Sequence, residues 1–346
     1  MNPQILMFVN ISVAHEDGIE EIVWIAYGME MVFYLLSFAT VPLLHHFLRN
    51  SKIFHVNLQL LFLVACYNVY PFTVARIGII YYESQRDLQC GTYEPESNSC
   101  PIGLIVVSLL RVFVLSLVPV LLVAIFVERS VATVKVETYE LHFYRPLAYL
   151  SALLSLCIAF FIATSFTFGI VSRTVADCLA ISGTCMGGVF TLIVSQVNNE
   201  KLARIHNSCY TLSKRYQLGE NVRTMQILTF ITSFTILNNV FLVLLFYIHA
   251  LEISWTIRNY IGIFLSLYMS IYYFFTTFIG LFANQQIYKL AKRMFIQKFV
   301  QLRDRSEKER ENKQIFDTKG QMMYLGANQD DYFTQLESQW AACRTR

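Results

Sequence analysis

Three ionisable side chains lie well inside long apolar runs of this 346-residue sequence: Glu30, Arg76 and Arg111. A charged side chain at the centre of a bilayer costs about 2.5–3.5 kcal/mol even on the lenient insertion scale. Such residues should therefore face the interior of a helix bundle, a wet cavity or one another. In one interpretation they line a ligand cavity, where the arginines hold an anionic or polar group. In the other, Glu30 pairs with an arginine and the pair only fixes helix packing.

A second acid–arginine pair, Glu128-Arg129, stands at the end of the third apolar run and is followed by Ser130. A local ion pair there could open and free Arg129 for a partner, which would give the protein two states. The alternative is an ordinary arginine at a membrane interface. Arg223 precedes the sixth apolar run. The helix of that run would extend through Arg223 beyond the membrane, on the side where Arg129 lies, and a movement of the helix could present Arg223 to a partner.

Eight cysteines are present, and two of them open apolar runs: Cys100 opens the third and Cys178 the fifth. A Cys100–Cys178 disulfide would tie the short connection between the fourth and fifth runs over the third. The rival pair is Cys90–Cys100, which closes a short loop. We favour Cys100–Cys178, because it constrains a far longer segment of chain.

No catalytic constellation is recognisable in the sequence. It has no H-E-x-x-H, no G-x-S-x-G and no glycine loop for phosphate, which are the common local signatures of hydrolases and nucleotide enzymes. The pair His45-His46 is more simply a solvated interfacial pair than a metal site. We therefore expect no enzyme activity, no cofactor and no metal site.

Composition and the length of the apolar runs set the fold class. Charged residues make up 15% of the chain and the mean hydropathy is +0.47, whereas soluble domains carry about 25% charged residues. Roughly 20 apolar residues are needed to cross a bilayer, and helices satisfy their own backbone hydrogen bonds there. The prediction is an all-α membrane protein, a bundle of seven transmembrane helices with the lipid bilayer as partner. Pro71 should kink the second helix and Pro119 the third. The seven runs are Ile22–Leu44, Val56–Tyr82, Ile102–Val127, Leu147–Val171, Val175–Val197, Gln226–Ala250 and Tyr260–Phe282.

Basic residues are distributed unequally between the two sides of these runs. One side, with the tail, holds 22 lysines and arginines and the other holds three. Basic residues accumulate on the cytoplasmic side, so the tail should be inside and the N-terminus extracellular. Asn10-Ile11-Ser12 is a glycosylation sequon in that outer segment, and Glu30, Arg76 and Arg111 then fall in the outer half of the membrane. The net charge of +3 is too small to suggest nucleic acid as a partner.

The predicted organisation has four parts. Residues 1–21 form an extracellular N-terminus without an evident cleavable signal peptide, and residues 22–283 form the seven-helix domain. Residues 284–303 alternate apolar and basic side chains at helical spacing, which is typical of an amphipathic helix on an anionic leaflet. Residues 304–346 form a charged, flexible cytoplasmic tail.

Two segments resemble a known family. The group Glu128-Arg129, Ala132-Thr133 and Tyr139-Glu140 is similar to the third-helix signature of the nematode serpentine chemoreceptors of class epsilon (Sre). The run from Leu212 to Leu218, followed by Glu220-Asn221 and Arg223, resembles the stretch before that family's sixth helix. Related classes, alpha and beta, share parts of this stretch. Two features depart from common receptor patterns: Ser130 stands where many receptors have an aromatic residue, and the seventh run lacks N-P-x-x-Y.

The resemblance implies a G-protein-coupled chemosensory receptor in the plasma membrane, in sensory neurons and their cilia. It would bind a small external ligand and engage a heterotrimeric G protein, with Arg129 acting in coupling. A multi-pass transporter or channel is the alternative. Repeated halves and paired glycine–proline breaks would favour that alternative, and neither is visible in the sequence.

Overall fold

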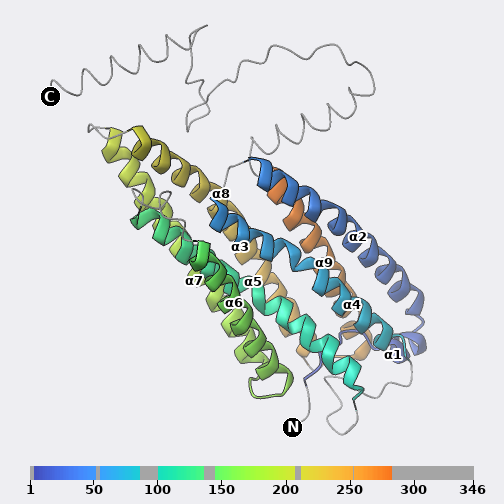
Figure 1. The fold of residues 1–346 in the computed structure, drawn as a ribbon. Helices are drawn as coiled ribbons and strands as arrows, with labels where there is room; N and C mark the ends of the chain where they lie inside the picture. Colours follow the sequence, from blue (N-terminus) through green and yellow to red (C-terminus); the bar gives the residue numbers. More distant parts are fainter. Residues whose placement is uncertain are drawn as a thin grey trace, which may run out of the picture.

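The structure is a computed structural model that describes residues 4–51, 55–85, 100–135, 145–206, 212–251 and 253–282. Within these ranges the chain forms α-helices and no strand, and the long helices run lengthwise beside one another (Figure 1). The elements, in order, are α1 (Ile11–Glu16), α2 (Glu20–Ser51), α3 (Val56–Tyr67), α4 (Val69–Glu83), α5 (Ile102–Val134), α6 (Arg145–Thr167), α7 (Arg173–His206), α8 (Leu212–Ala250) and α9 (Trp255–Phe282).

Seven segments of the described chain are long and apolar enough to cross a membrane, which confirms the predicted seven-helix bundle. They are Glu20–His46, Val56–Glu83, Ile102–Val134, Pro146–Thr167, Arg173–Arg204, Asn221–Ala250 and Trp255–Thr277. Large apolar side chains cover their outward faces: Phe161 is 71% exposed, Leu237 70% and Leu35 65%. A surface this apolar needs a nonaqueous environment, and lipid supplies it.

The second span is interrupted between α3 and α4, at Asn68. Pro71 has no N–H, so it cannot donate the helical bond to the Tyr67 carbonyl four residues earlier. At this interruption the Asn68 side chain donates from Nδ2 to the backbone oxygen of Val114, at 2.9 Å, which ties the second span to α5. Pro119, in contrast, lies inside α5, which continues without interruption from Ile102 to Val134.

Several helices are longer than the apolar runs that predicted them. α5 continues to Val134, α7 to His206, and α8 begins at Leu212. Helical hydrogen bonding continues past the last apolar turn, because helix geometry does not depend on the solvent that surrounds it. The fourth helix is shorter than predicted: it ends at Thr167, and Gly169 then takes a φ of 71°, the left-handed conformation that favours glycine after a helix C-terminus.

α5 is the central helix and contacts α3, α4, α6, α7 and α8. Two large apolar clusters lie along it. One cluster includes Leu121 and Ile125, and the other includes Val112 and Val114. α5 therefore passes through both halves of the core.

The first described residues belong to the bundle rather than to a separate unit. Residues 4–10, here called the crossing segment, have no helical structure and lead into α1 at one end of the bundle (Figure 1). We call this end the α1 end, and the opposite end, where α5 finishes, the Arg129 end. The side chains of Ile5, Leu6, Phe8 and Val9 are buried. The predicted amphipathic helix 284–303 and tail 304–346 lie outside the described residues.

Candidate functional site

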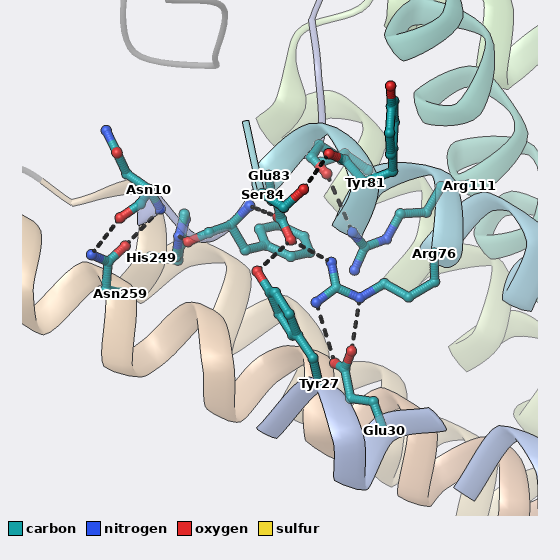
Figure 2. Close-up of polar contacts among 12 residues, drawn as sticks. Asn10, Tyr27, Glu30, Arg76, Tyr81, Glu83, Ser84, Arg111, His249 and Asn259 are labelled. Atoms are coloured by element: carbon teal, nitrogen blue, oxygen red, sulfur yellow. Dashed lines mark hydrogen bonds and ion pairs between the residues drawn. The ribbon is translucent and has the colours of Figure 1, made fainter. Parts of the chain in front are cut away.

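Arg76 is the centre of a buried ion network at the α1 end. Its Nε lies 3.0 Å from Oε2 of Glu30 on α2 (Figure 2). Its Nη1 lies 2.9 Å from Oε2 of Glu83, which is on α4 like Arg76 itself. All three side chains are at most 2% exposed. Arg76 and Glu83 are seven residues apart, which is two helical turns, so they share one face of α4.

Further donors surround the carboxylates of this network. The Tyr27 hydroxyl donates to Oε2 of Glu83 at 2.8 Å, and the backbone N–H of Phe8 donates to its Oε1 at 3.2 Å. Nη2 of Arg76 also donates to the second oxygen of Glu30, at 3.4 Å. A buried ion pair is tolerated only when its remaining polar atoms are satisfied in this way. The sequence allowed a buried pair between Glu30 and one of the arginines. The structure forms this pair with Arg76, and Glu83 is a second carboxylate partner of the same arginine.

Arg111 on α5 lies beside this network but differs from Arg76 in its partners (Figure 2). It is 0% exposed, and its Nη1 donates to the backbone oxygen of Leu6 at 3.3 Å. Its Nε and Nη2 have no hydrogen-bond partner, and it forms no ion pair with any carboxylate of the described residues. The guanidinium carbon lies 4.4 Å from the centre of the Phe8 ring, a cation–π distance.

The crossing segment is held by hydrogen bonds to five different helices. Its bonds alternate along the backbone, at residues 4, 6, 8 and 10. They are Gln4 N–H to the Thr167 oxygen (2.9 Å), Leu6 N–H to Ser108 Oγ (3.0 Å), Phe8 N–H to Glu83, His249 Nε2–H to the Phe8 oxygen (2.9 Å), and a mutual pair between the Asn10 backbone and the Asn259 side chain (2.8 and 3.1 Å).

A close approach between backbones seats this segment on α9. A Cβ added to Gly262 would lie 2.2 Å from the oxygen of Phe8 and 2.8 Å from its carbonyl carbon. No other residue type fits that position without moving the segment, because such contacts are far shorter than van der Waals distance. The crossing segment is therefore packed into the bundle as a core element is.

The Arg129 end holds the second candidate pair. Nε of Arg129 lies 2.5 Å from Oε2 of Glu128, its Nη2 lies 2.6 Å from Oε1, and both residues are 4% exposed. The local ion pair predicted from the sequence is thus formed, buried and closed. Next to it, the Asn198 side chain and Lys201 on α7 donate to Thr133 on α5, which fastens the two helices together.

Arg223 lies on α8, at the start of the sixth span, Asn221–Ala250, and is half-buried. The structure therefore places it on the predicted helix, apart from the network around Arg76. Its role in coupling stays a prediction.

The predicted Cys100–Cys178 disulfide is wrong. Cys178 is a free thiol on the exposed face of α7, and Cys100 is disulfide-bonded to another residue. The reason is geometric: the fifth span turns Cys178 outward, whereas Cys100 packs against Ile5 and Leu104. The rival partner considered from the sequence, Cys90, lies outside the described residues.

These two cysteines should respond differently to replacement. Cys100→Ser is expected to lower the free energy of unfolding by about 2–4 kcal/mol, because it removes a covalent constraint on the unfolded chain. Cys178→Ser, at an exposed free thiol, should change it by less than about 0.5 kcal/mol. Thermal unfolding of the purified protein, with and without reductant, would measure both. Equal effects of the two replacements would contradict the assignment.

Asn10 caps α1 with its side chain, whose Oδ1 accepts from the N–H groups of Ser12 and Val13. The side chain is partly exposed. Asparagine is among the residues that cap helices best, so this position has a local structural role whether or not it is glycosylated. Among the described residues no group of His, Cys, Asp and Glu is arranged to hold a metal ion.

Comparison with known proteins shows the family to which this seven-helix chain belongs. A family model described as "Sre G protein-coupled chemoreceptor" matches residues 2–341. The chain belongs to the Sre chemoreceptor family. A curated relative, serpentine receptor class epsilon-1 of Caenorhabditis elegans, is 30% identical over 195 residues, which cover 54% of this chain and 53% of the relative. The chain thus matches about half the length of that relative.

Several residues at the α1 end of this Sre chain escaped the sequence analysis. Glu83 could have been found, because it stands seven residues after Arg76 on the same helical face. The apolar run from Ile5 to Val9 was a signal too, since five consecutive apolar residues are unusual in a free segment. No sequence pattern pointed to Tyr27, whose contact depends on how α2 is turned toward α4.

Proposed function

We propose that this chain is a chemosensory receptor of the plasma membrane, which binds a small external ligand at the α1 end and activates a heterotrimeric G protein at the Arg129 end. Membership of the Sre family supports this coarse assignment. Basic residues are in excess in the sequence that follows α2, α5, α7 and α9, which supports placing the end where these helices finish in the cytosol. A location in the cilia of sensory neurons follows from the chemosensory role.

The observation that carries the mechanism is that one helix holds both sites. Arg111 and Arg129 stand 18 residues apart on α5, about 27 Å along its axis. A ligand that moves α5 at Arg111 would act on the Glu128–Arg129 pair through a continuous, centrally packed helix. Coupling over this distance requires such a two-state element, biased by both sites.

The geometry divides the predicted ligand residues into two groups. Arg111, with its unpaired donors, is the residue that we assign to ligand contact. Arg76 and Glu30 form an ion pair with one another, so we assign them to holding α2 and α4 in place beside the ligand site. Arg129 and Arg223 are assigned to the G-protein side, and Glu128 to holding Arg129 in the resting state.

Ligand-evoked signalling in a heterologous cell tests this function. A cell that expresses the receptor with a G-protein reporter is expected to respond to some small odorants, pheromones or tastants of a screening panel. The double variant Glu128→Gln/Arg129→Ala should abolish the response while cell-surface expression persists, because the charge that would meet the G protein is gone and no carboxylate is left buried without its cation. A response that survives in this double variant, or an ion current without G protein, would favour a transporter or channel instead.

Glycosylation tests the proposed orientation. If the α1 end is extracellular, Asn10 should carry a glycan that an endoglycosidase removes, which a shift in gel mobility would reveal. Ser12→Ala should abolish that shift, since it destroys the sequon but keeps Asn10 as the helix cap. If an antibody detects an N-terminal epitope tag only after the cells are permeabilised, the N-terminus is cytosolic and the proposed orientation is wrong.

A further inference from the structure

The crossing segment covers Arg111 from the extracellular side of the proposed orientation. The Phe8 ring stacks on the guanidinium, and the Leu6 carbonyl occupies Nη1. The side chains of Leu6 and Phe8 belong to the same apolar cluster as Tyr34, Phe72 and Val112. The segment therefore covers one face of the Arg111 guanidinium and its Nη1 group.

Arg111 offers an unused binding edge. Nε and Nη2 carry the two parallel N–H groups along one side of a guanidinium, and both lack a partner here. This edge is the one that binds a carboxylate with two hydrogen bonds. A buried cation with two of its three nitrogens unpaired is costly. This cost argues that something other than the described residues completes the site.

Apart from the ion network of Arg76, Glu30 and Glu83 beside it, the surroundings of Arg111 are apolar and aromatic. Phe72 lies 6.0 Å from the guanidinium carbon, and Tyr34 and Val112 are buried beside it. A ligand that replaces Leu6 and Phe8 would place an apolar body against these walls. A polar or sugar-like body would leave its own hydrogen bonds unmade there.

We propose that Arg111 anchors a site for small carboxylic acid anions with an apolar body, and that the crossing segment fills this site until such a ligand displaces it. The inference rests on the proposed function only in taking the α1 end as extracellular. In this structure the Glu128–Arg129 ion pair is formed while the crossing segment covers Arg111. We therefore assign the segment-filled site to the resting state.

Competition between segment and ligand has a measurable consequence. The apparent affinity falls in proportion to the fraction of molecules whose site is free. If the segment is seated in roughly nine of ten molecules, unseating it tightens the apparent Kd about tenfold. A change that loosens the segment without touching Arg111 should therefore improve binding.

Gly262→Ala is that change, because its Cβ would collide with the backbone of Phe8. Gly28→Ala is the matched control, since a Cβ there has nothing within 4 Å. The full chain, purified in detergent, is titrated with propionate, hexanoate, decanoate and benzoate and with the corresponding alcohols. Binding is measured by isothermal calorimetry, without G protein, so the result does not depend on signalling.

We expect at least one carboxylate to bind, its alcohol to bind far more weakly, and Gly262→Ala to tighten the apparent Kd about tenfold with Gly28→Ala unchanged. Arg111→Gln should weaken binding on the order of 100-fold while the protein stays folded, because it removes donors that lack partners. Arg111→Lys should retain part of the affinity. If Gly262→Ala does not fold, Asn259→Ala loosens the segment without touching Arg111, because it removes both hydrogen bonds to the Asn10 backbone.

Three results would overturn the inference. They are equal binding of carboxylates and alcohols, unchanged or weaker binding in both loosened variants, and no binding of any carboxylate to a loosened variant. If carboxylates bind as expected but no G-protein response follows in cells, the site stands and the proposed signalling function fails.

Discussion

Arg76→Met is expected to leave almost no folded receptor. The replacement strands the carboxylates of Glu30 and Glu83, both at most 2% exposed, without their cation. Removing one partner of a buried ion pair costs about 3–5 kcal/mol, which is a large fraction of the roughly 5–15 kcal/mol that stabilises a typical domain, and here two carboxylates lose their partner. Size-exclusion chromatography of a fluorescent fusion and thermal unfolding would measure the loss.

Two further variants isolate the cause. Arg49→Met removes an arginine that is exposed, and should change stability by less than about 0.5 kcal/mol. Adding Glu30→Gln and Glu83→Gln to Arg76→Met should restore much of the folded protein, because neither position then holds a buried carboxylate without its cation. If Arg76→Met folds as well as the parent, the network does not hold the helices together.

Glu128→Gln is expected to raise basal G-protein signalling several-fold. The change keeps the shape of the side chain but removes the charge that holds Arg129, at 2.5 Å in the closed pair. Coupling free energies of about 1–3 kcal/mol shift a two-state equilibrium 5- to 150-fold. Ligand-free activation of the reporter, normalised to surface expression, measures the effect.

Glu200→Gln is the matched control at the same end of the bundle. Glu200 pairs with Arg204 at 3.7 Å, but the two side chains are 54% and 80% exposed. Exposed pairs contribute little, so basal signalling should not change. Unchanged basal activity in Glu128→Gln, together with an intact ligand response, would mean that this pair is not the switch.

The two buried arginines at the α1 end show why burial alone does not assign a role. Arg76 and Arg111 are both 0% exposed, and from the sequence both were candidates for holding a ligand. Arg76 is surrounded by carboxylates, whereas Arg111 keeps two N–H groups without partners. The arrangement around Arg76 stabilises the fold, whereas Arg111 keeps N–H groups with which it can bind a ligand.

The seven spans and the adjacent Glu128–Arg129 pair could be predicted because they depend on local properties of the chain. An apolar run of sufficient length must form a helix in lipid, whatever its neighbours are. Neighbouring charges such as Glu128 and Arg129 can meet without help from any other element. The same holds for the interruption near Pro71, since a missing N–H acts within its own helix.

Only the tertiary structure decided the contacts that depend on how the helices are turned about their axes. A rotation of α7 places Cys178 on the exposed face and so excludes it as the partner of Cys100. The packing of α2 against α4 decides that Glu30 meets Arg76 rather than Arg111. The path of residues 4–10 across the bundle depends on a gap at Gly262, more than 250 positions away in the chain. Such contacts join residues far apart in sequence, and hydrophobic periodicity constrains which face is buried but not which neighbour it meets.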